Sequence, residues 1–239
     1  MKELLKYHTR IYLKSNKLVM PLLLWLVFLR IGYSQKPLEY LPNIVMSAGV
    51  LLFITSWLGF SYMDLEDPIT EQIMILKLSS IHWYNISKII FLIGISLMMS
   101  LISVAVPVIQ NILLRGSLFK REIIYSDVLG AVLLHFLIAV LGAMVGALAH
   151  PRIIKNRKLA VLAAGSVALI GYTIGIIKSN FPVAKLVIWV FPPVYDILEK
   201  FNGLEYFSLS NMLIPVIYGC VYIILYILLQ MFLLYKVKY

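Results

Sequence analysis

Long apolar stretches separated by short polar connections dominate the chain. Each can cross a hydrocarbon core about 30 Å thick at about 1.5 Å per helical residue, given some tilt or flanking side chains that reach for water. We therefore predict an all-α membrane protein with six transmembrane helices. The predicted spans are residues 18–33, 44–63, 89–114, 128–149, 159–177 and 212–234. Because no internal repeat or interdomain linker interrupts them, residues 18–239 are expected to form one transmembrane domain.

The overall composition supports this reading of the pattern. Of the 239 residues, 62% are apolar and 13% are charged, and the mean hydropathy is +0.93. A typical soluble domain has about 45–50% apolar and about 25% charged residues. A water-soluble globule is excluded because too little polar surface is available, and disorder is excluded because disordered chains are poor in apolar residues.

Residues 1–17 are basic and periodic. Leu4, His8 and Tyr12 share one side of a helix with other large side chains, and most of the cations lie elsewhere. This pattern predicts an amphipathic helix in the membrane interface, with its lysines directed toward anionic lipid headgroups. The alternative is a basic flank that only orients the first span.

The distribution of cations predicts the orientation in the bilayer. With the N-terminus inside, the predicted inner segments hold 13 of the 21 Lys and Arg residues and the outer segments hold seven. Cytoplasmic loops carry such an excess, so we expect both termini inside, and the short basic segment 150–158 is the clearest inner marker. We expect a bacterial plasma membrane. The lipid bilayer accounts for the basic charge, and no nucleic-acid partner is expected because no soluble domain is present to bind one.

A mixed polar segment between the second and third spans predicts a short helix. Asp67 is followed by a proline, as at a helix N-cap, and Glu71 falls in the first turn, where the helix dipole favours an anion. Ile69, Ile73 and Leu76 then recur at helical spacing. Such an apolar stripe suits insertion into a groove on a partner protein. The alternative is a connector packed on the bundle's own base.

The order of these elements resembles the type-2 permease family of ATP-binding-cassette transporters. A basic N-terminal helix and two spans precede a cytoplasmic helix, which leads into a third span. In that family an acidic residue opens this coupling helix, a Leu and a small residue or Pro end it, and a Lys often starts the third span. The resemblance assigns ATPase coupling to Asp67, Glu71, Leu78, Ser79, Ser80 and Lys88. This chain departs from the family at Ser80, where many relatives have Pro, and at Gln72-Ile73, where many have Gly-Thr.

The resemblance implies a permease subunit of an exporter for a peptide, lipid or hydrophobic small molecule. Two permeases, identical or related, would pair with two ATPase chains that hold ATP and Mg. This chain has no G-x-x-x-x-G-K-[ST] motif, so ATP hydrolysis would belong to the partner. We expect no catalytic residue, no metal site and no cofactor in the chain itself.

The connection between the fifth and sixth spans contains an apolar piece too short to cross the membrane. It includes Trp189 and Phe191 and stops at Pro192 and Pro193. The pattern predicts a re-entrant or interfacial segment with aromatic side chains at headgroup depth. The family has similar short re-entrant helices that cap the outer side of the translocation route. The alternative is an aromatic anchor without a gating role.

Polar side chains inside the spans are candidates for a substrate route. Ser47 and Thr55 lie in the second span, and Ser166 and Thr173 share a face of the fifth. They would line a route where two permeases meet, or they simply bond to carbonyls of their own helices. His135 in the fourth span is a functional candidate as an intramembrane ionisable group, or a neutral histidine bonded to a neighbouring helix.

Other functional classes are also compatible with the sequence. A six-span substrate-binding or immunity-type membrane protein without ATPase coupling would have a buried polar pocket and no role for residues 67–80. An intramembrane enzyme would depend on His135. Carriers driven by protons or sodium are disfavoured because the predicted spans contain no Asp or Glu except at their edges.

Overall fold

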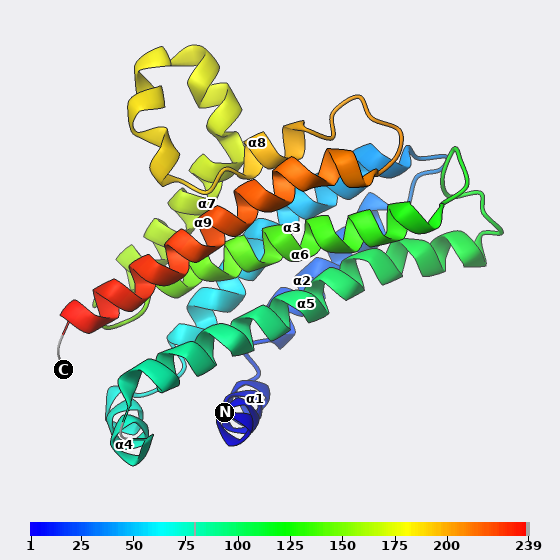
Figure 1. Ribbon diagram of the computed structural model, residues 1–239. Helices are drawn as coiled ribbons and strands as arrows, with labels where there is room; N and C mark the ends of the chain where they lie inside the picture. Colours follow the sequence, from blue (N-terminus) through cyan, green and yellow to red (C-terminus); the bar gives the residue numbers. More distant parts are fainter. Residues whose placement is uncertain (79, 238–239) are drawn as a thin grey trace.

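The computed structural model describes residues 1–78 and 80–237, and within them the chain is helical with no named strand. Figure 1 shows long helices running side by side, with α1 and α4 below them. The helices are α1 (Lys2–Lys14), α2 (Val19–Gly32), α3 (Tyr40–Met63), α4 (Pro68–Leu78), α5 (Ile81–Leu113), α6 (Tyr125–Leu148), α7 (Arg157–Asn180), η1 (Pro182–Leu186), η2 (Ile188–Val190), α8 (Val194–Glu199) and α9 (Leu209–Lys236).

Five helices are long and apolar enough to cross a membrane, namely α3, α5, α6, α7 and α9. The first predicted span is α2, which has only 14 residues. That is about 21 Å of helix, less than a hydrocarbon core requires. It becomes a sixth candidate only together with α1, from which it is bent by 75°. The multi-pass character is therefore confirmed, with five or six candidate spans.

The third predicted span begins earlier than the sequence indicated. Helix α5 has 33 residues and starts at Ile81 rather than at residue 89. At about 1.5 Å per residue it is about 50 Å long, so it extends beyond a hydrocarbon core. Its first turns are rich in polar residues, which the pattern assigned to a connection. Tyr84, Ser87 and Lys88 are instead buried in contacts with neighbouring elements.

The core of the bundle is the close pair of α3 and α6. Gly142 lies so close to α3 that an added side chain would meet Thr55 and the carbonyl of Leu52. Gly146 lies equally close to the Ser56 carbonyl. Small residues allow helix backbones to approach in this way. In this structure, the Gly-x-x-x-Gly pattern of α6 is used for packing within one chain.

The connections gather at two ends of the bundle. Helix α4 and the C-terminal end of α9 lie at the left in Figure 1, and the connection between α5 and α6 lies at the right. We call these the α4 end and the opposite end. At the opposite end, Leu38 donates its N–H to the Leu118 carbonyl at 2.8 Å and accepts from Lys120 N–H at 2.9 Å. This short bridge ties the α2–α3 connection to the α5–α6 connection.

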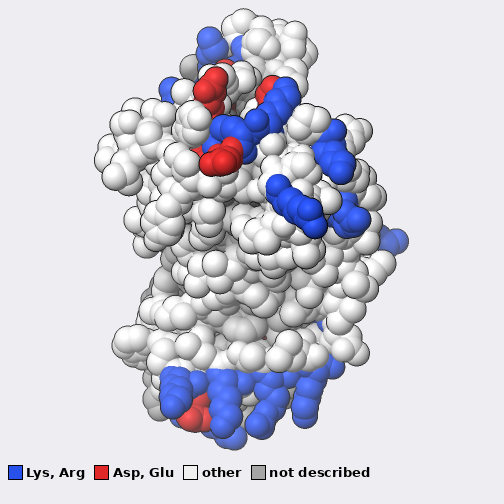
Figure 2. All heavy atoms as spheres, turned by 90° about the vertical axis from the view of Figure 1, so that its right-hand side faces the viewer, with Lys and Arg blue, Asp and Glu red and all other residues white. Residues whose placement is uncertain are grey.

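The flanks of the bundle are apolar. Leu162 on α7 and Leu228 on α9 are examples of large side chains that are more than half exposed. In Figure 2 a wide area without charged residues separates basic groups along the lower edge from mixed charges above. Such a surface suits contact with lipid tails.

Candidate functional site

Helix α4 has the start that the sequence predicted. Asp67 Oδ2 accepts the N–H of Ile69 at 3.1 Å, and the Asp67 carbonyl accepts the N–H of Glu71 at 3.0 Å. Asp67 itself is exposed, and the helix ends at Leu78, which is partly buried. Ser80 precedes α5 without a side-chain cap hydrogen bond. The predicted coupling residue Ser79 lies outside the described residues.

Glu71 and Lys88, both predicted for ATPase coupling, form an ion pair with each other. Lys88 Nζ lies 3.2 Å from Glu71 Oε1, and both side chains are nearly fully buried. The same carboxylate oxygen lies 3.6 Å from Arg152 Nη1 and 3.7 Å from His150 Nε2. Glu71 therefore faces the bundle. Its contacts attach α4 to α5 and to the α6–α7 connection.

Glu66 is a second carboxylate bound to the same lysine. It lies 3.0 Å from Lys88 Nζ, and Tyr7 donates its hydroxyl to Glu66 Oε1 at 2.8 Å. Tyr84 donates to the other oxygen. Burial alone raises the pKa of Glu66, but the Lys88 charge and these hydrogen bonds outweigh it and lower the pKa below its usual value. We call Glu66, Glu71, Lys88, His150 and Arg152 the α4-end cluster.

The cluster also binds the C-terminal end of the chain. Arg152 Nη2 donates to the Leu234 carbonyl and to the Val237 carbonyl, both at 2.9 Å. Burial, with the nearby Lys88 and Arg152 charges, lowers the pKa of His150 well below its usual value. His150 is therefore neutral near pH 7. The α4-end cluster joins α4, α5, the α6–α7 connection and α9 at one place.

Helix α1 packs on this end with its apolar side. Leu4, His8 and Tyr12 are buried, and His8 Nε2 lies 2.8 Å from the Ser87 hydroxyl. Burial and the Lys88 charge lower the pKa of His8 to about 4, although Glu66 opposes this change. The exposed side carries Lys2, Lys6, Arg10 and Lys14. Figure 2 shows a row of basic side chains along the lower edge of the molecule, where α1 lies in Figure 1.

The outward side of α4 is apolar and exposed. Ile69 is 67% exposed, Ile73 is 48% exposed and Leu76 is 79% exposed. We call these three residues the α4 stripe. On a helix with about 3.6 residues per turn, Glu71 lies on the opposite side from them. One side of α4 is therefore held by buried charges while the other presents apolar side chains to the surroundings.

The predicted route residues do not come together at one site. Ser47 lies 2.9 Å from His135 Nε2 and 3.3 Å from the Tyr33 hydroxyl. Thr55 donates to carbonyls of its own helix, as Thr173 does to Leu169. Ser166 is exposed on α7, whereas Thr173 lines a pocket between α3 and α7.

His135 is buried between α3 and α6. Its Nδ1 lies 2.8 Å from the Ala131 carbonyl, so both ring nitrogens have partners, and its side chain is fully buried. These contacts join α3 and α6.

The predicted cap residues belong to the connection that contains η1, η2 and α8. Trp189 is 66% exposed, Phe191 is partly buried, and Pro192 and Pro193 are buried. Pro192 packs directly on Gly171 of α7. Tyr222 and Tyr226 of α9 donate to the carbonyls of residues 189 and 190 at 2.7 and 3.0 Å. The connection is therefore attached to both α7 and α9.

Sequence reasoning missed Glu66, His150 and Arg152 as members of one cluster. In the sequence the segment 150–158 marks only the orientation in the bilayer, and Glu66 is one of several acids near the end of a span. No local pattern links residues so far apart in the chain. Within residues 1–78 and 80–237, no group of three or more His, Cys, Asp or Glu side chains is placed to hold a metal ion.

No protein-family model, curated protein or solved structure matches the chain.

Proposed function

We propose that the chain is the permease subunit of a transporter driven by a separate ATPase, and that the α4 stripe docks on that ATPase. The observation that carries the proposal is the two-sided construction of α4. Ile73 and Leu76 are exposed, whereas Glu71 is 3% exposed and ion-paired with Lys88. A partner that pushed on the stripe would transmit the displacement to α5 because the buried charges hold the helix to it.

The mechanism follows from that attachment. Packed helices switch between discrete arrangements rather than deforming continuously. Closure of two ATPase chains around ATP and Mg would press on α4 and, through the contacts of His8 and Tyr7, on α1. A second copy of this chain, or a related permease, would complete the route. The α4 end would then face the cytoplasm, with both termini inside, α1 in the membrane interface and the η1–α8 connection as the outer cap.

The resemblance of the order of elements to type-2 permeases is the second support for this proposal. We infer that the cargo is a peptide, a lipid or a hydrophobic small molecule moved outward across a bacterial plasma membrane. The exposed apolar flanks of α7 and α9 suit such a subunit.

A six-span substrate-binding protein is the second candidate. A pocket of about 410 Å³ between α3 and α7 favours it. That candidate predicted a buried polar pocket, whereas this pocket is lined mainly by apolar residues and opens at the surface. It also leaves the exposed α4 stripe without a role.

The test is a pair of aspartate substitutions on α4. Tagged chain would be purified in mild detergent from its native membrane, and the ATPase subunit would be identified and its hydrolysis measured. Leu76→Asp places a charge in the stripe, and we expect it to lower the amount of bound ATPase by about tenfold or more, as for a charge buried in an apolar interface. Thr70→Asp adds the same charge at another exposed position of α4 and should retain the ATPase.

Two results would overturn the proposal. One is a native complex that contains no protein with a nucleotide-binding P-loop. The other is equal ATPase recovery with Leu76→Asp and with the wild-type chain.

A further inference from the structure

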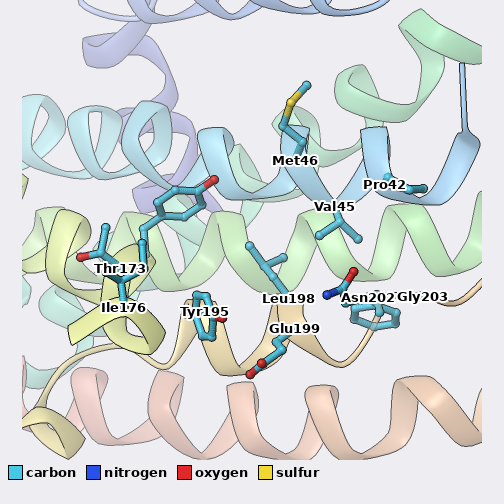
Figure 3. A pocket seen from close by; sticks show the side chains of 12 residues that line it. Pro42, Val45, Met46, Thr173, Ile176, Tyr195, Leu198, Glu199, Asn202 and Gly203 are labelled. Carbon is cyan, nitrogen blue, oxygen red and sulfur yellow. The ribbon is translucent and has the colours of Figure 1, made fainter. Parts of the chain in front are cut away.

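A pocket between α3, α7 and α8 lies outside the α4-end cluster. Its volume is about 410 Å³, within the range of about 300–1,000 Å³ that is common for small-molecule sites. Figure 3 shows Val45 of α3 on one side and Ile176, Tyr195 and Leu198 across from it. The pocket shares Asn202 with a neighbouring hollow that includes Lys120 and Arg121, so it lies toward the opposite end of the bundle.

The walls and the rim of this pocket differ in chemistry. Val45, Met46, Ile176 and Leu198 offer apolar surface. Glu199 also lines the pocket, is exposed, and is the last residue of α8. The pocket thus combines an apolar space with a carboxylate at its edge.

Glu199 differs from the neighbouring acid on the same short helix. Asp196 accepts two short contacts from Lys178, at 2.9 and 2.7 Å. None of the ion pairs in the described part of the chain includes Glu199. Lys178, which is paired with Asp196, and Lys185 line an adjacent hollow together with Glu199, but neither forms an ion pair with Glu199 in the described part of the chain. A carboxylate without an ion-pair partner of its own, next to an apolar space, is complementary to a ligand with a positive head group and an apolar tail.

The location of the pocket fits such a molecule. Pro42 and Val45 lie in the first turns of α3, near the end of a candidate span. A membrane amphiphile has its head group at the interface and its tail in the hydrocarbon core. A head group at Glu199 and a tail between α3 and α7 would match this arrangement.

We propose that this pocket binds a cationic amphiphile, with its apolar tail between α3 and α7 and its positive head group at Glu199. This binding does not depend on an ATPase. It holds for the isolated chain whether or not α4 docks a partner.

Photolabelling of the detergent-purified chain tests the proposal. Two probes have the same long alkyl tail with a photoreactive diazirine, and one ends in an amine while the other ends in a carboxylate. The amine should label the pocket segments, residues 42–46, 172–176 and 195–203, about fivefold more than the carboxylate, as expected for one exposed ion pair. Equal labelling by the two probes would overturn the assignment of the head group.

Matched variants separate the tail site from the head-group site. Ile176→Trp places a larger side chain at the pocket and should reduce labelling of these segments by both probes. Leu228→Trp on the exposed flank of α9 is its control and should not. Glu199→Gln should remove the preference for the amine, whereas Glu122→Gln, at another exposed glutamate, should keep it. Labelling that is unchanged by Ile176→Trp, or a preference that survives Glu199→Gln, would overturn the proposal.

Discussion

Buried ion pairs hold both ends of the bundle, but the two sites are constructed differently. At the opposite end, Asp127 is fully buried and binds Arg121 through two contacts, at 2.5 and 3.0 Å. The same carboxylate accepts the N–H groups of Ile124 at 3.1 Å and Phe207 at 3.4 Å. Arg121 also donates to the Glu205 carbonyl at 2.5 Å. One acid therefore has one cation and two backbone donors.

The α4-end cluster shares its charges among more groups. Lys88 binds two carboxylates, and Glu71 faces Lys88, Arg152 and His150. The elements it joins include α4, whose other side is exposed. At the opposite end, the ion pair thus joins connections between helices to one another. At the α4 end, the ion pairs hold a helix whose other side is exposed. Loss of one group should therefore affect the whole bundle at the first site and mainly α4 at the second.

The largest effect is expected from Asp127→Ala. It leaves Arg121 partly buried without its carboxylate and two backbone N–H groups without an acceptor. Breaking a buried pair by removing one partner costs about 3–5 kcal/mol. The free energy of unfolding in detergent should fall by that amount. Glu39→Gln removes an exposed pair with Lys120 and is the control, for which we expect no measurable change. Equal effects of the two substitutions would contradict the comparison.

Acidification should loosen the α4 end before the opposite end. The pKa of His8 is lowered to about 4 in the folded protein, against 6.5 for an ordinary histidine. Between these values the unfolded chain binds more protons than the folded chain, so stability falls as the pH falls. The loss for His8 reaches roughly 3 kcal/mol, and His150 acts in the same direction.

Glu66 extends this trend to lower pH. Its folded pKa is lowered, so its contribution is present above the unfolded pKa and is lost as the pH falls through the folded pKa.

Hydrogen exchange at pH 7.5 and pH 5 measures the loss of stability caused by His8, region by region. Residues 2–14 should become less protected at pH 5, while residues 114–124 change little. His8→Asn should reduce this pH dependence, and a uniform change across both regions would argue against titration at the α4 end as the cause.

A smaller, local effect is expected from Glu71→Ala. Lys88 keeps Glu66, and Arg152 keeps the carbonyls at the end of α9, so only part of the α4-end cluster is lost. Leaving buried donors without one acceptor costs about 1–3 kcal/mol. Hydrogen exchange should increase in residues 68–78 and stay constant in residues 125–148. A loss of protection throughout α6 would show that the α4 end, too, holds the whole bundle.

Local patterns predicted much of the fold. Apolar stretches located α3, α6, α7 and α9 to within a few residues, and Asp67 with the following proline located the start of α4. They located the end of α5 but missed its start, where Tyr84 and Lys88 look like members of a polar connection. These residues are helical because Glu66 and neighbouring groups satisfy their polar atoms in a buried site.

For the candidate site, the sequence alone determined that Glu71 lies in the first turn of a short helix and that Lys88 lies where the next membrane span begins. It also determined the spacing of Ile69, Ile73 and Leu76, because helical periodicity is a local property. Only the tertiary structure decided that Glu71 faces Lys88, Arg152 and His150, and that the stripe faces outward. Ion pairs between residues distant in the chain depend on how the helices pack, and no local pattern specifies that packing.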